Sequence, residues 1–568
     1  MKARVSGHLS IFLVFLFSLF ILHGCGGGSS GGSSSSTQSG TVSVALTDAP
    51  GLQYDHVWIT VKEIWFHTSN AAGPHEAGWL KYLLSSPVTV DLTTLINGTL
   101  SNAIGNIALP LGNYQQIRLF LASTEGALIV SPNPPAGQQG TPVTLQYNNE
   151  VDLQVNGQSY QAPLRIPNPS YGIGLFGNFQ VTNGGTLRLA VDFDVDDDVV
   201  KTISGLNPQF ILKPRLGYFD LDKAGAIAGA IDPSVITSGG FNFVIKAEEL
   251  SADGTYHIVR RTTTINPDGT FVLYPLPAGG AGKTYDIMLR GRDVDTVIIK
   301  GVPVTKGTTP QNPTQIGAAS WGPATTKILM NYDNTEFTQN LSGPMSPTGS
   351  WLNFYQTLPG AGEMPYEIRF RHVNPFSGKF ADPIELSTGP IYAGTYNSGN
   401  LINLTATTPV EQSGGYGVAF EAYQFTRTYI PGLFVGAANQ SYATIPPQTL
   451  QVNQGLSADT VSGNLIVPTP NLGLDTGYVL ASRDGLIVDA INAGSTGTGL
   501  MANGGAYSFT LPGGSSSTPL PGAFYGLHAI AWKTGAVLAT LSVGIPRIAD
   551  LRSGNDTNLD INMLKIVP

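Results

Sequence analysis

Short runs in which apolar and polar residues alternate recur along the whole chain and are typical of β-strands. Thr41-Val42-Ser43-Val44-Ala45-Leu46 and Val57-Trp58-Ile59-Thr60-Val61 are clear examples. Successive side chains of a strand point to opposite faces, so a period of two indicates a strand with one buried face. Helical periodicity is weak throughout, and only residues 92–100 predict a short helix. The pattern predicts an all-β chain made of several β-sandwich domains in series, immunoglobulin-like or transthyretin-like.

One apolar run, near the N-terminus, does not follow this pattern. Residues 9–22 are apolar except for Ser10 and Ser18, and Lys2 and Arg4 precede them. A positive segment followed by an apolar run of this length is typical of a signal peptide, and the run is short for a membrane span of about 20 residues. No later apolar run reaches 18 residues, so the sequence predicts export and no spanning helix.

Cys25, the only cysteine of the 568 residues, follows this run directly. Leu22-His23-Gly24-Cys25 resembles a bacterial lipobox, although His23 stands where a small residue is usual. The resemblance implies cleavage before Cys25, lipidation of Cys25 and attachment of the chain to a membrane through its N-terminus. Since position 26 is Gly and not Asp, the outer membrane is favoured in a two-membrane cell, on its periplasmic or cell-surface face. The alternatives are an ordinary signal peptide or an N-terminal anchor.

The composition fits an exported β-protein and argues against nucleic-acid binding. Only 12% of residues are charged, about half of the usual share. The net charge of −9 becomes −11 when Lys2 and Arg4 leave with residues 1–24, and a negative chain is repelled by a phosphate backbone. With one cysteine, neither disulfides nor a thiolate metal site are expected. Residues 25–39 are rich in Gly and Ser and predict a flexible tether.

Four sequence motifs occur in order within residues 40–222, which we expect to form the first domain. They are residues 40–50 (Gly-Thr-Val-Ser-Val-Ala-Leu-Thr-Asp-Ala-Pro), 61–64 (Val-Lys-Glu-Ile), 112–119 (Gly-Asn-Tyr-Gln-Gln-Ile-Arg-Leu) and 189–195 (Leu-Ala-Val-Asp-Phe-Asp-Val), with Ile211-Leu212-Lys213-Pro214 closing the series. The series resembles the bacterial lipoprotein family known as domain of unknown function 4382. The resemblance implies an exported β-rich domain and, because the family has no established activity, it identifies no catalytic residues.

Residues 223–319 predict a second domain. Asn266-Pro267-Asp268-Gly269 lies between two runs of β-forming residues, and an Asp-Gly pair in this setting predicts a hairpin. The order of motifs, with residues 225–231, 270–273, 276–279 and 285–289, is similar to carboxypeptidase regulatory-like modules. This resemblance implies a small transthyretin-like sandwich that serves as a scaffold or binding module.

The rest of the chain repeats one local pattern: a turn, an aromatic strand, a Leu-Pro-Gly turn and a further strand. Residues 349–370 and 503–532 follow it, as residues 266–289 do with Leu-Pro-Ala-Gly in the turn. The copies are irregularly spaced, which predicts sandwich domains in series and not a solenoid. We expect a third domain at residues 320–448 and a fourth at 449–568, with Pro446-Pro447 as the linker between them.

An acidic run offers the sharpest candidate chemistry. Asp192, Asp194 and Asp196 would share one face if the strand continued through them, and Asp197 and Asp198 follow. Calcium takes six to eight oxygen ligands, so these three carboxylates predict a weak calcium site. An EF-hand loop is excluded, because its sixth and twelfth positions would be Asp197 and Ile203. The alternative is a solvated strand end with charges that protect a sheet edge.

Trp58 offers a candidate binding surface. In the run from Val57 to Val61 it alternates away from the three β-branched residues expected in the core, so its ring would face outward or lie under a second layer. An exposed indole stacks well on a sugar or another apolar ligand. The alternative is that Trp58 and the other tryptophans belong to cores.

No motif of an enzyme or of a nucleotide site is present in the sequence. Gly-x-Ser-x-Gly occurs only inside the Gly/Ser-rich tract, at residues 27–32, and not as a strand-to-helix elbow, while a P-loop and His-Glu-x-x-His do not occur. His56, His67 and His75 are read as ordinary loop and strand-end histidines and not as zinc ligands. We therefore predict a lipid-anchored envelope protein that acts as a non-catalytic binding, adhesion or structural module, with a glycan or envelope protein as partner. No cofactor is expected apart from calcium. The alternative is an exported hydrolase of polysaccharide or peptide with accessory sandwiches, which would show one cleft with perturbed carboxylates or a histidine.

Overall fold

The described part of the chain consists almost entirely of β-strands, which confirms the predicted all-β class. The computed structural model describes residues 38–49, 54–124, 126–129, 144–155, 157–167, 169–203, 209–231, 243–280, 282–291, 294–316, 337–386, 390–398, 402–411, 416–432, 443–444, 446–466, 476–493, 505–532 and 542–565. Cys25 and the predicted tether up to residue 37 lie outside these residues, whereas Ser39, the last residue of the predicted tether, is already the first residue of strand β1 (Ser39–Ala49).

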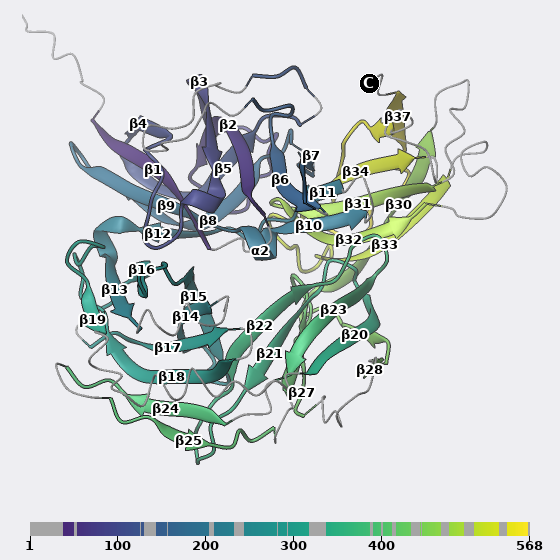
Figure 1. The fold of residues 1–568 in the computed structure, drawn as a ribbon. Coiled ribbons are helices and arrows are strands. Elements are labelled where there is room, and N and C mark those ends of the chain that lie inside the picture. The colour runs from purple at the N-terminus through teal and green to yellow at the C-terminus, as the bar shows by residue number, and fades with distance from the viewer. Residues whose placement is uncertain are drawn as a thin grey trace, which may run out of the picture. The chain divides into compact units, whose positions relative to one another are not determined.

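The first domain is a sandwich of two sheets (Figure 1). The smaller sheet has the order β12 (Gly217–Asp220), β9 (Thr186–Asp194), β1 (Ser39–Ala49), β4 (Gly105–Pro110). The larger sheet has the order β10 (Val199–Ile203), β11 (Gln209–Leu212), β7 (Gln158–Arg165), β6 (Glu150–Val155), β2 (His56–His67), β5 (Gly112–Leu121), β8 (Ile173–Val181), and β3 (Leu80–Asp91) pairs with β2. Val42 and Val44 of β1 share one core with Val57 and Ile59 of β2, as the alternation predicts.

Helical structure in the described residues is limited to three short turns. These are η1 (Leu92–Thr94), α2 (Val195–Asp198) and η2 (Leu221–Lys223). The short helix predicted at residues 92–100 is thus a single 3-10 turn, capped by Asp91, whose side chain accepts a hydrogen bond from the Thr93 N–H. No helix in this part of the chain has both the length and the apolar character required to cross a membrane.

Three sandwiches with one shared topology follow in the described residues from 224 to 565. In one sheet of each sandwich, the first strand pairs antiparallel with the fourth strand and parallel with the last. In the other sheet, the second strand pairs antiparallel with the third and with the fifth, and the fifth pairs with the sixth. We call them the first, second and third repeats.

The strands of the three repeats have the following bounds. The first repeat comprises β13 (Ala224–Ala230), β14 (Phe243–Leu250), β15 (His257–Thr264), β16 (Thr270–Pro277), β17 (Thr284–Gly291), β18 (Val294–Pro303) and β19 (Thr314–Ile316). The second comprises β20 (Phe337–Ser346), β21 (Trp351–Gln356), β22 (Tyr366–His372), β23 (Lys379–Leu386), β26 (Gly417–Glu421), β27 (Thr428–Ile430), β28 (Ala443–Thr444) and β29 (Gln448–Thr449). The third comprises β30 (Ser457–Ile466), β31 (Thr476–Arg483), β32 (Leu486–Asn492), β33 (Gly505–Gly513), β34 (Phe524–Trp532), β35 (Ser542–Gly544), β36 (Arg547–Asp550) and β37 (Ile561–Lys565).

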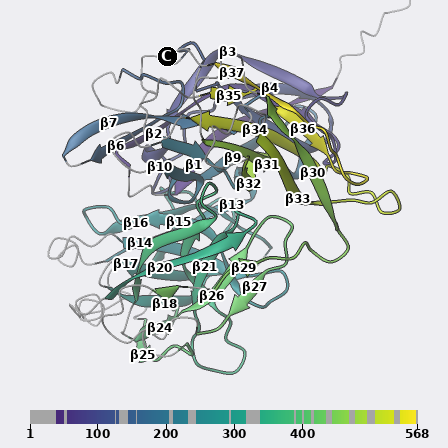
Figure 2. The same cartoon turned by 90° about the vertical axis from the view of Figure 1, so that its right-hand side faces the viewer.

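The repeats are tightly joined to one another and to the first domain. Two further strands, β24 (Ile391–Thr395) and β25 (Thr405–Thr407), extend a sheet of the first repeat through the pairing of β24 with β18, so this sheet contains residues from both sides of position 319. The second and third repeats share one large core. A smaller apolar cluster joins Val200 and Ile211 of the first domain to Leu480, Ile487 and Ile530 of the third repeat. Figure 1 shows β10 and β11 beside β31 and β32, and Figure 2 shows the third repeat next to the first domain from a second direction.

The turn at Asp268-Gly269 does not form the predicted hairpin. Asp268 accepts hydrogen bonds from the Thr270 N–H and hydroxyl, and Gly269 has a φ of 87°, so a tight turn is present. However, the strand before it, β15, pairs with β14, whereas the strand after it, β16, pairs with β13 in the other sheet. The turn therefore connects two layers, because Phe271 and Leu273 of β16 are buried in the core between them.

The predicted pattern of a turn, an aromatic strand, a Leu-Pro turn and a further strand falls on the same strands in the first and third repeats but not in the second. Tyr285 donates a hydrogen bond to the carbonyl oxygen of Pro277 (2.7 Å), and Tyr525 donates the same bond to Pro512 (2.6 Å). Both bonds connect the fourth strand, or its end, to the fifth. The copy at residues 349–370 lies instead on the second and third strands, which form a hairpin.

Candidate functional site

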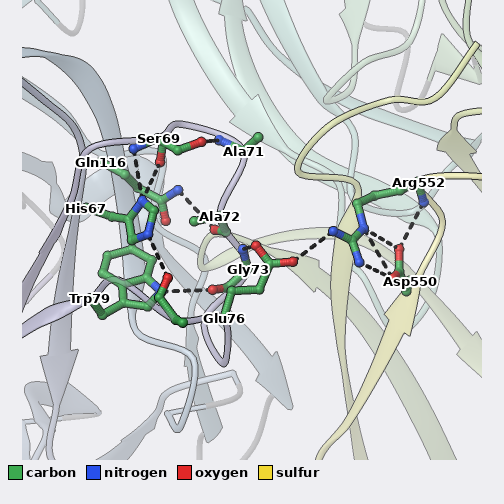
Figure 3. Close-up of polar contacts among 11 residues, drawn as sticks. His67, Ser69, Ala71, Ala72, Gly73, Glu76, Trp79, Gln116, Asp550 and Arg552 are labelled. Atoms are coloured by element: carbon green, nitrogen blue, oxygen red, sulfur yellow. Dashed lines mark hydrogen bonds and ion pairs between the residues drawn. The ribbon is translucent and has the colours of Figure 1, made fainter.

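A cleft of about 850 Å3 opens between a loop of the first domain and loops of the third repeat (Figure 3). The first-domain wall is the loop after β2, with His67, Ser69 and Glu76. The opposite wall consists of residues 519–521 and 550–556. The two walls are contributed by segments more than 400 residues apart in sequence, so the cleft exists only when the first domain and the third repeat are together.

Hydrogen bonds to its own backbone hold the first wall in shape. The Trp79 indole N–H donates to the Gly73 carbonyl at 2.8 Å, and the Gln116 amide donates to the carbonyls of Asn70 (3.3 Å) and Ala72 (3.2 Å). Gln116 is fully buried on β5 and Trp79 is 8% exposed. Because buried donors anchor the loop from beneath, the wall is already formed without a ligand.

The ring of His67 supports the same loop. The Ser69 N–H donates to Nδ1 at 2.9 Å, Nδ1 also lies 3.2 Å from the Ser69 carbonyl oxygen, and Nε2 lies 3.1 Å from the Ala77 carbonyl oxygen. The ring lies 5.0 Å from that of Trp79. Gly78 has a φ of 99°, and a Cβ there would come within 2.7 Å of Nε2, so a residue without a side chain is needed at this turn.

Arg552 is the centre of the opposite wall and connects it to the first. Its Nη2 donates to Asp550 at 2.7 Å and its Nη1 donates to Glu76 at 2.8 Å, across the cleft. The guanidinium carbon lies 4.2 Å from the centroid of the Phe524 ring, which supports it by a cation–π contact. Burial alone would raise the pKa of Asp550, but the hydrogen bonds and charge of Arg552 outweigh it and lower that pKa.

A second charged centre, which is buried, joins the first domain to the first repeat. Arg261 of β15 is 1% exposed and its Nη2 donates to the Thr47 hydroxyl (2.7 Å) and to the Asp48 carbonyl (2.6 Å), while Nη1 pairs with Asp192. Burial raises the pKa of Asp192 to about 6. For Asp48, burial and then the nearby charge of Asp194 hold the pKa well above its ordinary value. We call Arg261, Thr47, Asp48, Asp192 and Asp194 the buried junction.

The predicted calcium site at Asp192, Asp194 and Asp196 does not form. The strand ends at Asp194, whose carboxylate accepts a hydrogen bond from the Asp197 N–H at 3.3 Å and caps α2. The chain therefore turns before Asp196, and Asp192 is occupied by Arg261. Within the described ranges, no three His, Cys, Asp or Glu side chains are arranged to hold a metal ion.

The prediction that Trp58 presents an exposed ring is also wrong. Val57, Ile59 and Val61 do face the core, so the alternation is right. However, Trp58 is only 3% exposed, its indole N–H donates to Asp152 at 3.2 Å, and the His56 ring lies 5.6 Å from it. A polar layer covers this face of β2, and Trp58 is part of that layer.

The same polar layer contains two groups with shifted pKa values. The hydrogen bond between His56 Nδ1 and Asp91 Oδ2 (2.6 Å) raises the pKa of His56. Burial raises the pKa of Glu150 to about 7, although its carboxylate accepts hydrogen bonds from the N–H groups of residues 146–147 and from Gln161. These residues do not border the cleft. The raised carboxyl pKa of Glu150 thus lies away from the cleft.

The sequence reasoning missed both walls of the cleft and the contact beside it. Glu76 and Arg552 carry no local signal, because their pairing depends on tertiary structure. The contact beside the cleft had a signal: Asp484 (φ 55°) and Gly485 (φ 97°) form the tip of the β31–β32 hairpin, and Asp-Gly is the typical pair for such a turn. Asp484 accepts hydrogen bonds from Arg118 Nη2 (2.8 Å) and from the Gly174 N–H (3.0 Å) of the first domain.

Comparison with known families confirms the resemblance of the first domain. Residues 39–214 match the family described as "Domain of unknown function (DUF4382)". No curated protein matches the chain.

Solved structures resemble the chain only weakly. Two B repeat units of the collagen-binding protein of Staphylococcus aureus align at 10% identity over 93% of this chain and 100% of that one, with a TM-score of 0.12. The Bacillus anthracis TIE protein aligns at 8% identity over 92% and 75%, with a TM-score of 0.12. A putative adhesin from Bacteroides ovatus aligns at 10% identity over 49% and 92%, with a TM-score of 0.13. At such scores these similarities carry no argument about this chain.

Proposed function

We propose that this protein is a lipid-anchored, non-catalytic binding protein of the cell envelope and that the cleft is its ligand site. In this proposal Cys25 carries the lipid, residues 25–39 are the tether, and the outer membrane holds the anchor. The first repeat is the carboxypeptidase regulatory-like module, and the three repeats together serve as the scaffold that presents one wall of the cleft.

The observation that carries the proposal is the preformed cleft. Its volume of about 850 Å3 lies in the range of about 300–1,000 Å3 that small ligands and peptide segments occupy. Hydrogen bonds of Trp79 and Gln116 fix one wall, and the ion pairs of Arg552 fix the other. A site of this kind binds without a large ordering cost.

Binding is favoured over hydrolysis because of where the perturbed acids lie. A general acid at neutral pH needs a raised pKa beside the substrate. In the cleft the pKa of Asp550 is lowered, whereas the raised pKa values of Asp192, Asp198 and Glu150 belong to groups outside it. The hydrolase alternative has no comparable support.

The anchor is tested by Cys25→Ser. We expect the wild-type chain to sediment with membranes and to incorporate labelled fatty acid, and the variant to appear in the soluble exported fraction without label. Full membrane retention of the variant would contradict the lipid anchor.

The ligand site is tested by a melting-temperature screen of the purified full chain in detergent against envelope oligosaccharides and peptides. Ser553→Trp fills the cleft, and Thr557→Trp is the matched control, because Thr557 is exposed on the same loop but does not line the cleft. A true ligand stabilises the wild type and Thr557→Trp but not Ser553→Trp. Equal stabilisation of all three would place binding elsewhere, and release of cleaved product detected by mass spectrometry would contradict a non-catalytic role.

A further inference from the structure

The charged groups that line the cleft are unequal in number. Three carboxylates, those of Glu76, Asp550 and Asp556, border it, and Arg552 is the cation among the lining residues. The lining therefore has an excess of about two negative charges, in a chain whose net charge is itself negative.

The charge of Arg552 is already balanced by two carboxylates. Three of its five N–H groups are engaged: those on Nε and Nη2 donate to Asp550, and one on Nη1 donates to Glu76. The contact with Phe524 holds the guanidinium plane in place. An anionic ligand that approaches Arg552 is repelled by Asp550, Glu76 and Asp556.

The carboxylate oxygens of Glu76 and Asp556, by contrast, can accept further hydrogen bonds. An ionised carboxylate offers about four lone-pair positions, and each oxygen of Glu76 has one protein partner: Oε1 accepts from Arg552 and Oε2 from the Gly73 N–H. Asp556 Oδ2 accepts from the Asp550 N–H. The cleft thus combines an excess of negative charge with unused acceptor positions on its carboxylates, which suits a ligand that brings N–H donors and positive charge.

We infer that the cleft binds a peptide segment carrying Lys or Arg side chains. This rests on the proposed function and names the ligand class of its site. An ammonium or guanidinium group from the ligand completes the coordination of Glu76 and Asp556 by charge-assisted hydrogen bonds. A neutral oligosaccharide can donate its hydroxyls to the same carboxylates but brings no opposite charge. The negative field of the chain steers a cationic segment toward the cleft and increases its association rate.

The test is a fluorescence-anisotropy titration of the purified full chain with a labelled Gly-Lys-Gly-Arg-Gly peptide. We expect binding that weakens about fivefold in Glu76→Gln and in Asp556→Asn, the effect of one partly exposed charge pair. Binding should also weaken as the salt concentration rises, because exposed charges are screened. Glu363→Gln is the control, since Glu363 pairs with Lys300 in the first repeat and does not line the cleft, and it should bind as the wild type does.

The outcomes separate this inference from the proposed function. If a chito-oligosaccharide binds and is blocked by Ser553→Trp while the basic peptide does not bind, the peptide inference is overturned and the cleft remains a ligand site. Equal binding of a peptide with Gln in place of Lys and Arg also overturns it. If no probe binds, the inference and the cleft as ligand site fail together. Melting curves of each variant establish that loss of binding is not loss of folding.

Discussion

The cleft and the buried junction both connect the first domain to a later sandwich through an arginine, but the two arginines differ in their exposure to water. In the cleft, Arg552 and Glu76 are 37% and 41% exposed. In the junction, Arg261 is 1% exposed and its partner Asp192 is 22% exposed. A charge pair in water is worth little for stability, whereas loss of one partner in the interior leaves an uncompensated charge. The same chemistry therefore contributes little to stability at the cleft and much more at the junction.

The strongest test of this contrast is Arg261→Leu. The substitution leaves Asp192 without its cation and the Asp48 carbonyl and Thr47 hydroxyl without their donor. We expect a loss of about 3–5 kcal/mol in the free energy of unfolding at pH 7, as for a broken buried pair. Urea denaturation measures it. A loss below about 1 kcal/mol would mean that the junction does not hold the domains together.

The pH dependence of the junction is tested with Asp48→Asn. Asp48 Oδ1 accepts from the Val195 N–H, while Oδ2 is buried without a hydrogen-bond partner, so an amide keeps the one bond and removes the titration. Because the pKa of Asp48 is raised in the folded state, its proton stabilises the fold at low pH, and that stability is lost as pH rises through the folded pKa.

Relative to Asp48→Asn, the wild type should lose up to about 1.4 kcal/mol for each pH unit above about 4, until the folded pKa is passed. Urea denaturation from pH 4 to 8 measures the difference. Parallel stability curves for the two proteins would show that Asp48 is ionised in the fold. The comparison with the variant cancels the opposite trend of His372 and His528, whose pKa values are lowered by burial.

At the cleft the matching substitution is Arg552→Gln, and its effect on stability should be small. The side chain loses exposed pairs with Asp550 and Glu76, worth about 1 kcal/mol or less in total. The melting temperature in low and high salt is the measurement, and the difference from the wild type should shrink in high salt. A loss as large as that of Arg261→Leu would remove the contrast between the two contacts.

Calcium should have the smallest effect of all. Asp192 is paired with Arg261 and Asp194 caps α2, so a calcium ion would have to break both arrangements. We expect the same melting curve in millimolar calcium and in chelator. A rise in melting temperature with calcium would show that the acidic run rearranges around the ion.

The sequence predicted what depends on neighbours along the chain and missed what depends on neighbours in space. The strands at Val42 and Val57, the all-β class and the first-domain family follow from local alternation and motif order. Trp58 was misplaced because alternation tells which face a residue is on but not whether another layer covers that face. Asp196 was misplaced because Asp194 ends the strand by capping a turn.

Tertiary pairing explains the other misses. Asp268-Gly269 does make a turn, but the choice of β13 and not β15 as partner for β16 is decided by core packing. For the candidate site, Glu76 and Arg552 are surface residues in ordinary loops, and their meeting requires the first domain and the third repeat to be placed together. The identical strand order of the three repeats was only partly visible, through the Leu-Pro turns at residues 276–277 and 511–512.

The docking of the Asp484-Gly485 tip onto the first domain has a mechanical consequence. Arg118 and Gly174 of the first domain donate hydrogen bonds to this tip of the third repeat. The contact lies beside the cleft, which the first domain and the third repeat also form together. If the chain is tethered through residues preceding β1, tension from a ligand held in the cleft passes straight from the third repeat into the first domain. This route does not pass through the first and second repeats, so the chain that runs through these two repeats carries little of the tension while the tip stays docked.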